Sequence, residues 1–186
     1  MIQFENIHQL REWLEANGVN LERWGRSDAK SAEDLWKEIS SGESQIQDDS
    51  PLRMIHVVNI IIRSGDRILV EEGQQLGRNQ KRYRGFPPAE KVKAGESHID
   101  AAIRGLKEEL QISPDSIRIV SSSVAPQISI HESQSYPGLR TQYTIHEVEV
   151  ETDNLPDENF WTNETNVDDP VAKHHWKWKS LEEKFG

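Results

Sequence analysis

The sequence predicts an α/β domain preceded by a small helical extension. Residues 54–62 form a dense β-branched run that is typical of a buried strand, and residues 97–110 repeat apolar side chains at helical spacing. The polar segment 43–51 ends in Pro and has the composition of a linker. We therefore expect a helical extension with its linker over residues 1–50 and a larger domain over residues 52–180.

Two short helices are expected in the extension. Residues 6–17 carry apolar side chains on one face, and Asn6 is a suitable N-cap. A second helix is expected to begin after Ser31, with Asp34 completing a capping-box pattern, and to end near Gly42. One-faced helices of this length are not stable alone. We expect them to pack on the main domain or on a second subunit, which leaves a homodimer open.

The main domain is expected to alternate strands, turns and one long helix. A strand pair is expected over residues 54–62 and 67–71, with further strands at 117–124 and 139–151. Several Gly and Pro residues between positions 73 and 95 predict a long irregular loop, and loops of that length are often functional. Residues 152–169 are acidic and expected to be irregular, and a short helix is expected at the C-terminus.

The composition excludes several classes of function. Asp and Glu number 32 against 22 Lys and Arg, so the formal net charge of −10 argues against binding to bulk nucleic acid. There is no Cys, which excludes disulfides and thiolate metal sites. No apolar run is long enough to span a bilayer, and the first residues do not resemble a signal peptide. We expect a cytoplasmic protein with no membrane partner.

The helix over residues 97–110 carries adjacent carboxylates beside its apolar stripe. Glu108 and Glu109 are about 100° apart around the helix axis, so both can border the buried face. Neighbouring carboxylates repel each other unless a cation lies between them, and hard divalent ions such as Mg²⁺ prefer oxygen ligands. Arg104 precedes Glu108 by four residues and can pair with it. Taken alone, such a pair of Glu residues is usually part of a solvated face.

The wider pattern resembles the box of the Nudix family. That box reads Gly, five residues, Glu, seven residues, Arg-Glu, an aliphatic residue, any residue, Glu-Glu, any residue, Gly and an aliphatic residue. The residues in the same register here are Glu96, Arg104, Leu106, Glu108, Glu109 and Ile112. The segment 86–96 is also similar to the Pro- and Gly-rich run that precedes the Nudix helix. The resemblance implies a Nudix-like α/β/α sandwich with a mixed β-sheet.

The resemblance also implies an activity and a site. It implies a hydrolase that uses Mg²⁺ or Mn²⁺ to cleave a diphosphate linkage in a nucleoside diphosphate derivative, so that the partner is a small nucleotide or diphosphate substrate. Glu108 and Glu109 are the implied metal ligands and catalytic residues, and Arg104 is implied to orient a Glu. The metal would polarise a phosphoryl oxygen and activate water.

Three positions depart from the box. Glu90 stands where the family has its first Gly, Gly105 where it has the Glu after the Arg, and Gln111 where it has the late Gly. In the resembling enzymes the Glu replaced by Gly105 lies one turn from the last Glu of the box and shares the metal with it. Gly105 and Ala101 also create a shallow notch, which either another segment or a ligand can fill. The favoured interpretation is close packing of another segment.

Gly105 leaves two hypotheses open. Replacement donors are conceivable in flanking segments, although each is more often an ordinary surface or strand residue: Glu90, Glu132, Glu147, His131 and His146. Without a working metal site, the chain is expected to be a catalytically silent module that binds a nucleotide or a protein partner. Proteins with the same fold often differ in function, so the choice between hydrolase and binding module depends on the residues of the site.

A basic strip precedes the box. Arg82, Arg84 and Lys91 are candidate phosphate ligands, and Tyr83 is a candidate for stacking on a base. A solvated loop that balances the net charge is an equal alternative. His174 and His175 are expected to pack rather than to bind metal, because adjacent residues of a strand point to opposite faces.

Overall fold

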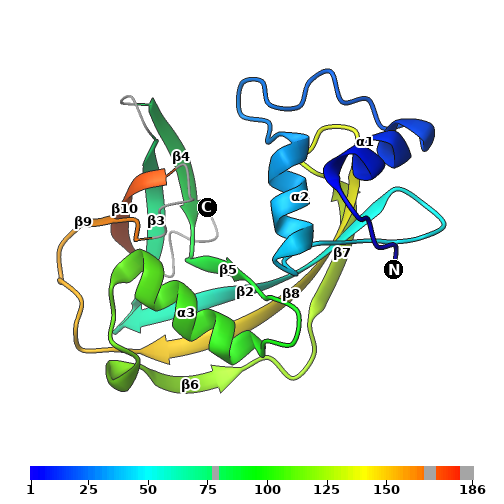
Figure 1. Ribbon diagram of the computed structural model, residues 1–186. Helices are drawn as coiled ribbons and strands as arrows, with labels where there is room; N and C mark the ends of the chain where they lie inside the picture. Colours follow the sequence, from blue (N-terminus) through cyan, green and yellow to red (C-terminus); the bar gives the residue numbers. More distant parts are fainter. Residues whose placement is uncertain (77–79, 166–170, 181–186) are drawn as a thin grey trace. The chain divides into compact units, whose positions relative to one another are not determined.

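The computed structural model describes residues 1–76, 80–165 and 171–180, and Figure 1 colours them along the sequence. The chain divides into two compact units. Unit 1 comprises Met1–Val57, Lys91–Ser97 and Pro126–Ile145, and unit 2 comprises Val58–Glu90, His98–Ala125 and His146–Gly186. In the described ranges, no helix is long and apolar enough to cross a membrane.

Unit 1 is built around the two helices of the extension. Its helices are α1 (Ile7–Ala16) and α2 (Ala32–Ser40). The predicted caps are confirmed: the side chain of Asn6 accepts from the first turn of α1, and Ser31 and Asp34 form a capping box on α2. The helices share an apolar core whose fully buried members are Leu10, Leu14, Leu35, Tyr136 and Leu139. The extension therefore has a core of its own, completed by a later segment of the chain.

Short strands frame this core. Strand β1 (Gln45–Ile46) pairs antiparallel with β2 (Leu52–Ser64), and β7 (Gln127–Glu132) pairs antiparallel with β8 (Arg140–Glu151). The segment expected to be a linker thus contributes a strand, and Ile46 is almost fully buried. Strand β7 was not predicted, because all of its side chains are exposed and no buried alternation marks it.

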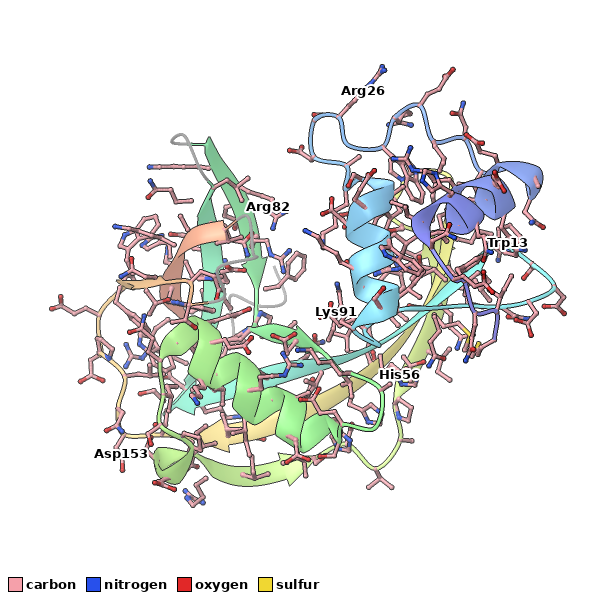
Figure 2. All side chains as sticks on the ribbon, viewed as in Figure 1. Trp13, Arg26, His56, Arg82, Lys91 and Asp153 are labelled. Carbon is pink, nitrogen blue, oxygen red and sulfur yellow. The ribbon has the colours of Figure 1, made fainter. Side chains whose placement is uncertain are left out.

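A buried ionic network ties α2 to β2 in unit 1. Glu38 is 5% exposed, and its carboxylate lies 2.6 Å from Arg53 Nη2 and 2.6 Å from Lys91 Nζ. Lys30 Nζ lies 2.9 Å away, and the Ser44 hydroxyl donates to the same carboxylate at 2.8 Å. Figure 2 shows Lys91 beside α2. Every carboxylate oxygen of Glu38 therefore has a cationic partner.

Unit 2 combines most of the sheet with the longest helix. The strands follow the order β6-β8-β2-β3-β10-β9, and β4 also pairs with β3. The bounds not yet given are β3 (Arg67–Leu76), β4 (Gln80–Phe86), β5 (Ala89–Lys91), α3 (His98–Leu110), the 3₁₀ turn Pro114–Ser116, β6 (Arg118–Ser122), β9 (Phe160–Asn163) and β10 (Val171–Ser180). Helix α3 contacts β6 and β8 through His98, which bonds to Ser122 and stacks on His146. The predicted α/β class with a mixed sheet and a small helical extension is confirmed.

The prediction of a long irregular loop over residues 73–95 is wrong. That region forms the end of β3, all of β4 and β5, with β4 running antiparallel along β3. Phe86 pairs with Glu71 and Tyr83 with Gly73, so β4 carries one extra residue there, and Gly85 has the left-handed φ of 78° that suits a bulge. The acidic stretch expected to be irregular includes β9, and the short C-terminal helix falls outside the described residues.

The buried network of Glu38 predicts an effect on stability. Replacing Glu38 by Gln leaves Arg53 buried without its carboxylate, so the free energy of unfolding should fall by about 3 kcal/mol. The matched control is Glu33→Gln, which breaks the exposed pair of Glu33 with Arg11 and should cost less than about 1 kcal/mol. Chemical denaturation followed by Trp fluorescence measures both. Equal losses in the two variants would contradict the assigned role of the network.

The same carboxylate predicts a pH dependence. Burial opposes ionisation of Glu38, yet Lys91, Arg53 and Lys30 hold its pKa well below the usual range. A depressed folded-state pKa gives stability above the unfolded-state pKa of about 4.3 that is lost as the pH falls. The loss begins near the unfolded-state pKa. Between about pH 5 and about pH 3, the free energy of unfolding should therefore drop more steeply in the wild type than in Glu38→Gln. Parallel profiles would refute this linkage.

Candidate functional site

Helix α3 presents its carboxylates from a well-buried stripe. Ala101, Ala102, Leu106 and Leu110 are buried as the apolar spacing predicts, and Gly105 is buried with them. The helix ends at Gln111, whose φ of 58° is left-handed, and the Ile112 amide donates back to the Leu106 carbonyl. The family pattern has Gly where Gln111 stands, which suits that conformation better. The turn is thus retained without the glycine.

Arg104 connects two carboxylates. Its Nη1 lies 3.3 Å from Glu90 Oε1 and 3.6 Å from Glu108 Oε2. The predicted pairing of Arg104 with Glu108 is confirmed, and Glu90 of β5 joins the same guanidinium. Glu108 also accepts a hydrogen bond at its main-chain carbonyl from the Thr165 hydroxyl at 3.0 Å. Arg104 therefore orients side chains on both α3 and β5.

Further carboxylates gather around a buried histidine on β10. His174 is 2% exposed, and its Nδ1 lies 2.6 Å from Glu71 Oε1 on β3 while its Nε2 lies 2.9 Å from Glu164 Oε2. Arg84 Nε on β4 contacts the other oxygen of Glu71 at 3.2 Å. His175 lies partly exposed and stacks on Trp161, so the two histidines face apart as expected. Packing of His174 is confirmed, but its partners are acidic.

These residues act on one another electrostatically. We call Glu71, Glu90, Glu109 and Glu164, together with His174, the carboxylate cluster. Burial raises the pKa of the Glu109 carboxyl well above its usual range, against the opposing charge of His174. The charges of Glu71, Glu90 and Glu164 raise it further. Burial disfavours a charged imidazole, yet a hydrogen bond with Glu71 and the charge of Glu109 raise the pKa of His174 to about 9.

The carboxylate oxygens of this cluster are the type of ligand that a hard divalent cation prefers. Among the described residues, no group of three or more His, Asp or Glu side chains already converges as a metal site. Mg²⁺, however, is usually held by one or two carboxylates together with water and substrate phosphates. The space in which a side chain at Gly105 would begin is filled by Glu90, whose Oε2 lies 3.5 Å from that point. Oxygen donors therefore remain on this face of α3 despite the glycine.

The candidate substrate-binding residues fall into both units. In unit 2, Arg82, which Figure 2 labels, and Tyr83 are exposed on β4, and Arg82 bonds to the Gln74 amide oxygen. Arg84 on the same strand reaches Glu71. Lys91 belongs to unit 1, where Glu38 and Glu43 hold its ammonium. Within unit 2, Arg84 contacts the carboxylate cluster, and within unit 1, Lys91 belongs to the ionic network of Glu38.

The other proposed donors have separate partners. His131 stacks on Tyr143 and Glu132 accepts from the Gly138 amide, whereas His146 stacks on His98. Sequence reasoning did not find His174, Glu71 and Glu164 as members of a site. Glu71 ends a strand pattern and His174 opens an aromatic one, so their shared burial depends on the pairing of β3 with β10. One sequence does not reveal that pairing.

The match to a family model agrees with the box pattern. The NUDIX domain model matches residues 52–183. Among solved structures, a NUDIX hydrolase from Nitrosomonas europaea is 19% identical, with a TM-score of 0.42 and coverage of 70% of this chain and 75% of that chain. An Ap4A hydrolase from C. elegans is 19% identical, with a TM-score of 0.38 and coverage of 71% and 82%. The mutator MutT protein from Bacillus halodurans is 16% identical, with a TM-score of 0.40 and coverage of 70% and 71%.

No sequence among curated proteins matches the chain. The family model nevertheless spans well over half of the residues, from the start of β2 to beyond β10. It includes the helix that carries Arg104, Glu108 and Glu109 as well as the strands that hold His174 and Glu71. With the α/β/α fold and the register of the box in agreement, the chain belongs to the NUDIX domain family.

Proposed function

We propose that the protein hydrolyses a diphosphate linkage in a nucleoside diphosphate derivative with the help of a divalent cation. The observation that carries the proposal is the position of Glu109. It lies one turn after the buried Gly105, against which Glu90 of β5 packs, so carboxylates from α3 and β5 border the same face of the helix. A protein rarely buries like charges together unless a cation offsets their repulsion.

Mg²⁺ or Mn²⁺ would be held by Glu109 and Glu108 and would supply Lewis-acid activation of a phosphoryl oxygen and of water. Arg104 orients the carboxylate of Glu108 from one turn earlier on α3. The two ring nitrogens of His174 form hydrogen bonds with Glu71 and Glu164, which holds these two carboxylates on either side of the ring. The residues of the chain thus supply acidic ligands on a rigid helix together with a buried support.

Strand β4 offers contacts for the rest of a nucleotide. Arg82 and Arg84 are two residues apart and therefore point to the same face of the strand, where guanidinium groups can pair with phosphate oxygens. Tyr83 is 72% exposed and Phe86 is 66% exposed, and exposed aromatic rings stack readily on bases. In this proposal Lys91 contributes through the extension and does not contact phosphate directly.

A catalytically silent nucleotide-binding module is the second candidate. The observation that favours it is Gly105, which removes one carboxylate from α3, together with the absence of a preformed group of three ligands in the described residues. Exposed aromatic and guanidinium groups on β4 support binding in either case. The two candidates differ in turnover and not in the expected class of ligand.

Metal-dependent turnover separates the candidates. The full chain is incubated with a panel of diphosphate-linked nucleotides, with and without Mg²⁺ or Mn²⁺, and products are resolved by ion-exchange chromatography. We expect turnover that requires the metal and that falls by about 100-fold or more in Glu109→Gln, because a ligand to the activating ion is lost.

The control is Glu15→Gln, which changes an exposed carboxylate on α1 and should leave turnover unchanged. Saturable nucleotide binding without turnover in the wild type would replace the hydrolase with the binding module. Turnover that persists in Glu109→Gln at the wild-type rate would remove the assigned role of the carboxylate cluster.

A further inference from the structure

Gly105 leaves α3 without a side chain directly beside Glu109. Residues four apart on an α-helix lie on the same face, one turn from each other. Gly105 precedes Glu109 by four residues and is buried. A Gly within a helix lowers stability by about 1 kcal/mol relative to Ala. A buried glycine at this position therefore indicates that another group needs the space.

Glu90 is that group. A Cβ placed on Gly105 would lie 3.0 Å from Glu90 Cβ, 3.3 Å from its Cγ and 3.5 Å from its Oε2. The three nearest atoms all belong to this one side chain, which reaches α3 from strand β5. The notch that the sequence predicts at Gly105 is thus closed by a carboxylate-bearing side chain. Close packing of another segment, the favoured interpretation, is confirmed.

The carboxylate of Glu90 is held in place and interacts with Glu109. Arg104 Nη1 contacts Glu90 Oε1 at 3.3 Å, so one oxygen faces the guanidinium. Glu90 is about one-fifth exposed (19%), which limits the screening of its charge by water. The negative charge of Glu90 is also one of those that raise the pKa of Glu109, as expected for a β5 carboxylate that packs against the face of α3 on which Glu109 lies.

We propose that Glu90 supplies from β5 the carboxylate that α3 lacks at Gly105, and that Glu90 and Glu109 bind the divalent cation together. The inference deepens the proposed function and rests on it. Compared with the box pattern, the Gly and the Glu have exchanged places: the carboxylate has moved to position 90 and the glycine to position 105. Glu90 thereby joins Glu108 and Glu109 as an acidic ligand, and water and phosphate supply the other ligands of the ion.

The packing between Glu90 and Gly105 can be measured by a double-mutant cycle. Gly105→Ala adds helix propensity, but in the wild type the new Cβ crowds Glu90 Cβ at 3.0 Å. In Glu90→Gly that crowding is absent, so Gly105→Ala should be more stabilising there by about 1 kcal/mol. The matched background is Glu90→Ala, which also lacks the carboxylate but keeps the Cβ and should behave as the wild type. The same effect in all three backgrounds would contradict the contact.

The relocation itself is tested by binding of Mn²⁺ alone to the metal-free full chain. Free Mn²⁺ is followed by electron paramagnetic resonance, and circular dichroism checks that each variant is folded. We expect Glu90→Gln and Glu109→Gln each to weaken binding by about tenfold or more. Glu72→Gln is the control, because Glu72 pairs with His175 and Lys177 instead, and its affinity should equal that of the wild type. The exchange variant Glu90→Gly/Gly105→Glu should recover most of the affinity that Glu90→Gly loses.

Each outcome decides between the two proposals. Absence of Mn²⁺ binding in the wild type, or unchanged affinity in Glu90→Gln beside a loss in Glu109→Gln, overturns the relocation. Metal-dependent turnover that is lost in Glu109→Gln but kept in Glu90→Gln overturns it as well and leaves the hydrolase standing. Mn²⁺ binding that requires both carboxylates, in a protein without turnover on any nucleotide, supports the relocation while the hydrolase fails.

Discussion

Repulsion among partly buried carboxylates is the constraint on which the candidate site of unit 2 depends. Four acidic side chains from β3, β5, α3 and the segment after β9 influence one another, and His174 is the buried base between two of them. Ionised carboxylates cannot share a poorly solvated region without compensating charge. Arg84 and Arg104 each neutralise one carboxylate from the edge of the group. Neither arginine forms an ion pair with Glu109 among the described residues, and the charge of His174 offsets only part of the repulsion, which a bound cation would offset further.

The rest of the fold keeps these groups in register. The apolar stripe of α3 fixes which residues of the helix face the sheet, and a buried Gly105 allows β5 to approach closely enough for Glu90 to lie against the helix. Pairing of β3 with β10 brings Glu71 beside His174. Because a helix or a strand carries every member except Glu164, small changes in one strand would alter the distances among several carboxylates at once.

Local patterns in the sequence predicted individual helices and strands, but they did not predict which strands pair over long sequence distances. The caps at Asn6 and Ser31 and the stripe of α3 depend on neighbours within one or two turns, and these predictions were right. Residues 80–86 read as a polar loop, since an exposed strand with two glycines nearby has no buried alternation. His174 was assigned to packing for a similar reason: the acidic partners that give it a chemical role come from other strands. Glu90 was recognised as a conceivable donor, but its approach to Gly105 needs coordinates.

Glu38 in unit 1 and Glu109 in unit 2 differ in the charges of the side chains around them. Glu38 in unit 1 is contacted by Arg53, Lys91 and Lys30, so its charge is fully offset and no ligand is required. Its pKa is accordingly held well below the usual range. Glu109 in unit 2 is partly exposed, but most of the charges that act on it are carboxylates, and its pKa moves in the opposite direction. A carboxylate whose protein partners repel its charge is the one that gains most from an external cation. The same residue type thus stabilises the extension in one place and, in our proposal, binds a divalent cation in the other.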